Sequence, residues 1–148
     1  MNCSAMAIEY ALAPQAAATP SEISAFLGWL DYSFSQIPAT VEFTSADVEP
    51  AELMDCWRVT GRLLISEAHG ETAPWDAETN RRFRAVHDWH HILTGAGFGW
   101  EGEKATYDYA CATAPEMIHW ILRSEILLQA AYRLETGSFA AEQKLVRV

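Results

Sequence analysis

Helix-start signals at intervals along the chain constrain its fold more than any other feature of the sequence. Thr19-Pro20-Ser21-Glu22 combines a capping residue, a proline at the first helical position and an acid in the first turn. Pro50, Asp76 and Pro115 open further segments in which apolar residues recur at helical spacing. We therefore predict helices near 20–36, 50–69, 76–94 and 115–136, with a short helix over about 101–113.

The segment Thr40-Val41-Glu42-Phe43-Thr44 alternates between polar and apolar residues and is rich in β-branched side chains. An isolated strand has no partner, so we interpret this segment as an extended connector. The predicted fold is all-α, a single-domain helical bundle of about five helices over residues 1–148. The segment 1–18 is rich in alanine, and the tail 138–148 has no clear helical period, so loose order is expected in both.

Charge and composition argue against several kinds of partner. The chain has 20 acidic and 10 basic residues and a formal net charge of -10, which repels nucleic acid and anionic membrane surfaces. No apolar stretch approaches the roughly 20 residues that span a bilayer. The three cysteines are too widely spaced for a disulfide framework or a zinc finger, and the N-terminus lacks the positive start of a secretory signal. We therefore predict a cytoplasmic protein with no nucleic-acid or membrane partner.

Three of the five histidines fall within one short stretch: His87, His90 and His91. His87 and His91 are four residues apart on the predicted helix 76–94, so their side chains lie one turn apart on the same face. A helix uses this spacing to offer two imidazoles to one metal ion. Asp88 lies next to that face, whereas His90 points away from the pair.

A carboxylate can complete this pair of ligands. The Gly-rich segment after Gly95 follows a helix rather than a strand, so we interpret it as a tight turn and not as a phosphate-binding loop. The turn brings Glu101 and Glu103, at the start of the next helix, back toward the histidines. Two histidines and one carboxylate leave open positions on zinc or iron, as in catalytic metal sites.

The sequence therefore predicts a site for a divalent metal ion, zinc or iron, with His87, His91, Glu103 and, as an added ligand, His119. Glu116 and His119 have the i, i+3 spacing of di-iron helical bundles, although this pair occurs once here. Asp88 and Glu101 are the predicted catalytic residues, which orient a ligand or move a proton.

The same stretch resembles a segment of phage and phage-related proteins whose role is mostly unassigned. That segment has the form F-R-A-x-H-D, then G-H, a small-residue loop ending in G-F, and G-E followed by an alanine. The matching residues here are Phe83-Arg84-Ala85-Val86-His87-Asp88, His91, Gly97-Phe98, Gly102-Glu103 and Ala105. His90 stands where the pattern has glycine, and the gap between Asp88 and the second histidine is one residue shorter. The resemblance implies no settled activity.

A second resemblance is to metal-dependent phosphohydrolases of the HD class, which are also all-helical. These enzymes use a histidine, then a His-Asp doublet, then a distant aspartate. In this chain His69, His87-Asp88 and Asp108 follow in that order. This resemblance implies hydrolysis of a phosphate ester with the help of a metal ion.

Two classes of function stay open. The first is a metal-dependent hydrolase that acts on a small-molecule substrate. The second is a noncatalytic helical protein, phage-related or assembled as a homo-oligomer, in which the polar cluster is a hydrogen-bonded core network that joins two helices. Metal content separates the two classes.

Overall fold

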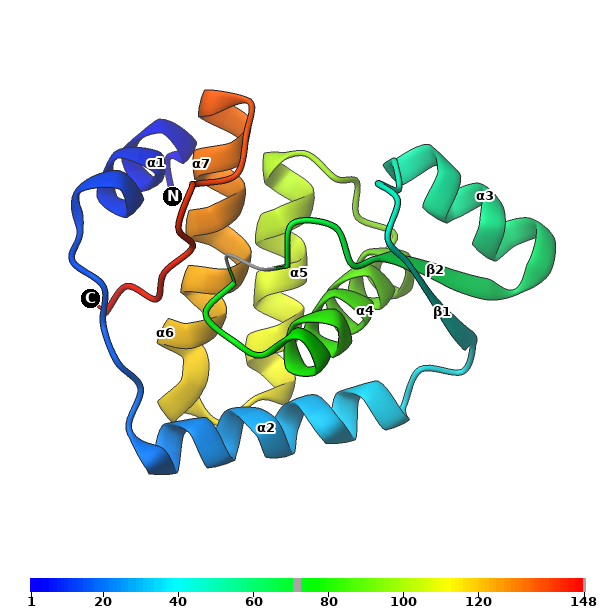
Figure 1. Ribbon diagram of the computed structural model, residues 1–148, viewed down its shortest axis with the longest axis horizontal. Coiled ribbons are helices and arrows are strands. Elements are labelled where there is room, and N and C mark those ends of the chain that lie inside the picture. The colour runs from blue at the N-terminus through cyan, green and yellow to red at the C-terminus, as the bar shows by residue number, and fades with distance from the viewer. Residues whose placement is uncertain (71–72, 148) are drawn as a thin grey trace.

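Helices make up most of the architecture (Figure 1), and the computed structural model describes residues 1–70 and 73–147. The first part of the chain contains α1 (Cys3–Leu12), α2 (Pro20–Ser35), β1 (Thr40–Thr44), α3 (Pro50–Thr60) and β2 (Arg62–Ser66). The second part contains α4 (Ala77–Thr94), α5 (Trp100–Thr113), the 3₁₀ turn η2 (Glu116–Ile118), α6 (His119–Leu122), the π-helical segment η3 (Arg123–Leu128) and α7 (Gln129–Thr136).

Local capping explains where the predicted helices begin. Thr19 and Glu22 form a reciprocal capping box, in which the Glu22 N–H donates to Thr19 Oγ1 at 3.2 Å and the Thr19 N–H donates to Glu22 Oε1 at 3.0 Å. At the start of α4, Asp76 accepts the Thr79 N–H at 2.8 Å. α4 ends at Gly95, whose φ of 68° is left-handed and favours glycine. These predicted helix starts and this helix end are confirmed.

The predicted helix 50–69 is wrong beyond Thr60, and the fold is therefore not strictly all-α. Gly61 ends α3 with a left-handed φ of 68°, and the chain then forms β2. β2 pairs in parallel with β1, with Thr40 opposite Arg62, so the predicted connector is a strand. Leu63 and Ile65 are fully buried while the residues between and beside them are less buried, which is the period of a strand.

The two ends of the chain pack against the core although their sequences carry no helical period. In α1, Met6 and Tyr10 are buried, and the Asn2 side chain caps the helix. In the tail, Val146 is buried and exchanges two hydrogen bonds with the hydroxyl of Ser124, at 2.9 and 3.1 Å. The Tyr10 hydroxyl accepts the backbone N–H of Lys144 at 2.9 Å. Contacts with the C-terminal helices and with each other, and not local helical signals, therefore hold the two ends of the chain in place.

α4 lies between two groups of buried apolar side chains. Phe83 and Val86 face the main core, which α1, α2, α5 and the C-terminal helices share. Ala85 faces a smaller cluster beneath the sheet, with Leu53, Leu63 and Ile65 as its other buried members. In the described part of the chain, no helix combines the length and the apolar character needed to cross a membrane. The central position of α4 places its histidine-bearing face against α5 and near α7.

Candidate metal centre

Three side chains predicted as metal ligands come together between α4 and α5. His87 Nε2 and His91 Nε2 lie 3.2 Å apart, as expected for residues one helical turn apart. Glu103 Oε2 is 3.0 Å from His87 Nε2, and Glu103 Oε1 is 3.4 Å from His91 Nε2. One ligand atom from each residue lies within 4.8 Å of the others, so this group could hold a metal ion.

The close approach of two glycines places Glu103 in this group. After α4 ends at Gly95, residues 96–99 turn the chain back, and α5 begins at Trp100. Gly102 packs against the turn so tightly that a Cβ atom there would lie 1.6 Å from the Gly97 carbonyl oxygen. Glu103 follows directly, with its backbone N–H donating to Gly99 at 3.0 Å. Only a residue without a side chain fits at position 102 in this arrangement.

Burial makes the electrostatics of this group strong. The side chains of His91, Glu103 and His87 are 0%, 5% and 19% exposed. Burial alone would raise the pKa of Glu103, but the charge and the N–H groups of the two histidines outweigh it and lower this pKa to about 2. Burial disfavours the charged form of His87, yet the Glu103 carboxylate overcomes this and raises the pKa of His87. Glu103 is therefore an anion that either a proton on an imidazole or a metal ion can balance.

The surroundings of His91 fix its ring. His91 Nδ1 lies 3.4 Å from the Ala96 carbonyl oxygen, and the ring stacks on Phe98 with centroids 4.2 Å apart. A carbonyl accepts a hydrogen bond and cannot donate one, so this contact favours a proton on Nδ1. His91 Nε2 then either carries a second proton, which it donates to Glu103, or offers its lone pair to a metal ion. His87 Nδ1 is buried and has no hydrogen-bond partner among the described residues, and the only polar contact of Glu103 Oε2 among them is the ion pair with His87.

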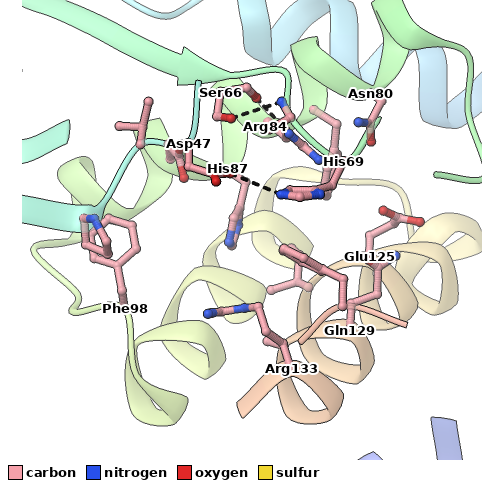
Figure 2. A pocket seen from close by; sticks show the side chains of 18 of the residues that line it. Asp47, Ser66, His69, Asn80, Arg84, His87, Phe98, Glu125, Gln129 and Arg133 are labelled. Carbon is pink, nitrogen blue, oxygen red and sulfur yellow. Dashed lines mark hydrogen bonds and ion pairs between the residues drawn. The ribbon is translucent and has the colours of Figure 1, made fainter. Parts of the chain in front are cut away.

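A cavity of about 370 Å³ opens beside His87, Asp88 and Glu103. Figure 2 shows it from close by, with Arg84 and His87 on one side and Glu125, Gln129 and Arg133 on the other. His69 also lines it, and its Nε2 is 3.2 Å from Asp47 Oδ1. The cavity has the size of a small-ligand pocket.

The other predicted site residues take different positions. Asp88 is half-buried in the wall of the cavity, and burial raises the pKa of its carboxyl. Glu101 is exposed and pairs with Lys104 at 2.8 Å, away from the cavity wall. His119 is not part of the group, because its Nε2 contacts the Ala114 carbonyl oxygen at 3.1 Å. His90 points away from the pair, as the sequence predicted, and packs against aromatic rings of α2 and α5.

The sequence alone did not identify the residues of η3 and α7 that form one wall of the cavity. Glu125, Gln129 and Arg133 are spaced four residues apart in an otherwise apolar helical run, and all three line the cavity. Burial raises the pKa of Glu125 to about 7, in spite of the neighbouring Gln129 and Trp75 side chains that lower it. The sequence signal that identifies these residues is a row of polar side chains, four residues apart, along a helical segment whose other residues are apolar.

The two resemblances map differently onto this geometry. Of the residues in the HD order, His69, His87 and Asp88 line the cavity, whereas Asp108 is exposed on α5 and does not. Of the residues that match the phage-related segment, His87, His91 and Glu103 form the group that could hold a metal ion. Phe98 stacks on His91, and Gly102 packs against the turn.

Compared with known protein families, curated proteins and solved structures, the chain matches none of them. The arrangement of the His87, His91 and Glu103 side chains is therefore what any functional conclusion has to rest on.

Proposed function

We propose that the protein binds a divalent metal ion, zinc or iron, through His87, His91 and Glu103, and uses it to hydrolyse a small-molecule substrate. The observation that carries this proposal is the close approach of the three side chains: the two imidazole Nε2 atoms lie 3.2 Å apart, and the two carboxylate oxygens of Glu103 lie 3.0 Å from His87 Nε2 and 3.4 Å from His91 Nε2. An ion about 2.0–2.2 Å from ligands in a tetrahedral arrangement holds them roughly 3.3–3.6 Å apart. The distance between the two imidazole nitrogens is close to this range, and one oxygen of Glu103 lies within 4.8 Å of both nitrogens.

The contact between His91 Nδ1 and the Ala96 carbonyl oxygen is compatible with a metal ion at Nε2. With its proton on Nδ1 toward Ala96, a neutral His91 presents a lone pair at Nε2 to Glu103 Oε1, 3.4 Å away. Two lone pairs that face each other in a buried site repel unless a cation lies between them. A metal ion meets this need, and so does a proton that converts His91 to its imidazolium form.

The cavity beside the three ligands provides room for a water molecule and a substrate, as hydrolysis requires. Three protein ligands leave a fourth position for water, and a bound zinc ion lowers the pKa of such a water to about 7. Among the predicted catalytic residues, Asp88 lines the cavity beside His87, whereas Glu101 faces solvent. Asp88 is therefore the residue we assign to orient the water and accept its proton.

The alternative is a noncatalytic network in which an imidazolium–carboxylate pair joins α4 to α5. The lowered pKa of Glu103 and the raised pKa of His87 favour this pair when no metal is bound. The two functions differ in one measurable property, because only the metal site loses stability when a chelator is added.

The test is the metal content of protein purified without a histidine tag, measured by mass spectrometry. We expect close to one equivalent of zinc or iron, and a melting temperature that falls with chelator. His87→Ala and His91→Ala should lose most of the ion, because each removes one of three ligands. His90→Ala is the matched control, since it changes the same residue type on the same helix and leaves the three ligands in place.

Less than about a tenth of an equivalent of metal, with no rise in melting temperature on adding zinc or iron, would rule out the metal site. If chelator does not change the melting temperature of the parent protein, but His87→Ala has a lower melting temperature than the parent, the cluster is a structural network. In that case each substitution should cost on the order of 1–3 kcal/mol, because it leaves a buried polar partner unsatisfied.

A further inference from the structure

We propose that the cavity binds a substrate with a phosphate or carboxylate group, and that Arg133 of α7 holds this anionic group opposite the metal ligands. The inference rests on the proposed metal site and adds the class of substrate. It starts from the polar wall formed by Glu125, Gln129 and Arg133, which the metal centre does not use.

Arg133 lies on the side of the cavity that faces the metal group. Figure 2 shows its side chain reaching toward His87 from the opposite wall. Both side chains line the same cavity, His87 from α4 and Arg133 from α7. A ligand that fills this space would therefore touch both groups.

Arg133 differs from most arginines of this protein. Six others form ion pairs with carboxylates: Arg58, Arg62, Arg81, Arg82, Arg123 and Arg147. Arg133 forms no ion pair with any described residue, and its Cζ lies over the ring of Phe139 at 5.8 Å from the centroid. Arg133 is half-buried, and the planar set of donors on its guanidinium suits a phosphate or a carboxylate.

Other donors face the same space. Arg84, on α4, lines the cavity and donates to the Ser66 carbonyl oxygen at 2.8 Å, which holds its guanidinium in place. Gln129 Nε2 is buried beside the Glu125 carboxyl without a hydrogen bond of good geometry to any described residue. A ligand oxygen could accept from Gln129 and from Arg133, which are one turn apart on the same wall.

Five carboxyl groups line the cavity, and three of them, those of Asp47, Glu103 and Glu125, are paired or partly protonated; the other two belong to Glu49 and Asp88. Asp47 is paired with His69, and Glu103 is paired with the two histidines. Burial raises the pKa of Glu125 to about 7, so this carboxyl is protonated part of the time at neutral pH and can then donate its O–H. A divalent ion at the metal group would add two positive charges on the side of the cavity opposite Arg133.

The experiment is a calorimetric titration of the full chain, loaded with one equivalent of zinc and freed of excess metal. Inorganic phosphate and acetate are the two probes, and they distinguish a phosphate-bearing from a carboxylate-bearing substrate. We expect one of them to bind, and Arg133→Gln to weaken that binding at least tenfold. Arg133→Lys should bind with intermediate strength, because it keeps the charge but loses the paired donors.

Arg58→Gln is the control, since Arg58 is exposed on α3, pairs with Asp55 and does not line the cavity. Its binding of the probe should equal that of the parent. Zinc content is measured for every variant, and Arg133→Gln should keep its metal, because Arg133 is not a ligand.

Absence of binding by both probes, or equal binding by Arg133→Gln and the parent, would overturn the inference while the metal site still stands. If the parent binds no metal, the proposed function fails on that measurement alone. The titration of the metal-free chain then tests Arg133 separately. If the parent binds phosphate or acetate and Arg133→Gln does not, the anion subsite at Arg133 is supported. If Arg133→Gln binds the probe as the parent does, the anion subsite is refuted.

Discussion

Gly102→Ala tests whether the contact between the turn and α5 builds the metal group. A Cβ atom at this position would lie 1.6 Å from the Gly97 carbonyl oxygen and 2.5 Å from the Gly97 carbonyl carbon. Real Cβ contacts stay beyond 3.0 Å, so the two backbone segments would have to separate by about 1.4 Å. The three atoms nearest to the new methyl group all belong to the backbone of Gly97, so no flexible side chain can move aside.

The size of the effect follows from two opposing terms. Alanine in a helix is favoured over glycine by up to about 1 kcal/mol, whereas overpacking of this kind costs roughly 1–3 kcal/mol or more. We expect a net loss of about 2 kcal/mol in the free energy of unfolding. The displacement also moves Glu103, the next residue, by more than the roughly 0.2 Å that metal–ligand distances tolerate. Metal affinity should therefore fall at least tenfold.

The assay is urea unfolding at pH 7.5 with chelator, combined with a zinc titration of each variant. Gly28→Ala is the matched control, because this glycine lies within α2 and a Cβ atom there would meet nothing within 4 Å. It should gain stability, by up to about 1 kcal/mol, and bind zinc like the parent. A Gly102→Ala variant that unfolds and binds zinc as the parent does would refute the account of how the turn positions Glu103.

Two further predictions concern a buried histidine and the small sheet. Burial lowers the pKa of His90 to about 4, from a reference value of 6.5. Below pH 6.5 the unfolded chain therefore binds a proton at this histidine, whereas the folded chain does not. The free energy of unfolding should fall by about 2–3 kcal/mol as the pH approaches 4. His90→Gln should flatten this part of the pH dependence, and equal slopes in urea unfolding of the two proteins would contradict it. Ile65→Ala should cost about 2–5 kcal/mol because Ile65 is fully buried, whereas Leu64→Ala, at a half-buried position, should cost clearly less. Similar losses at both positions, measured by the same unfolding assay, would argue against the alternation of β2.

Features that depend on neighbours within a helical turn could be predicted from the sequence alone. The capping box at Thr19 and Glu22 joins residues three apart, so it can form before any tertiary contact exists. The pairing of His87 with His91 is likewise a property of helix geometry, because residues four apart always share a face. The prediction that a carboxylate would join them rested on the shortness of the turn, and the structure places Glu103 there.

Tertiary structure decided the features that join distant parts of the chain. β1 pairs with β2 across more than twenty residues of sequence, and the apolar residues of 62–66 fit a helical spacing until that pairing is known. Register decided that Glu103 and not Glu101 meets the histidines, because the contact of Gly102 with Gly97 sets the rotation of α5. Arg133 reaches the cavity only because α7 packs near α4, and no local pattern in the sequence fixes which helices become neighbours.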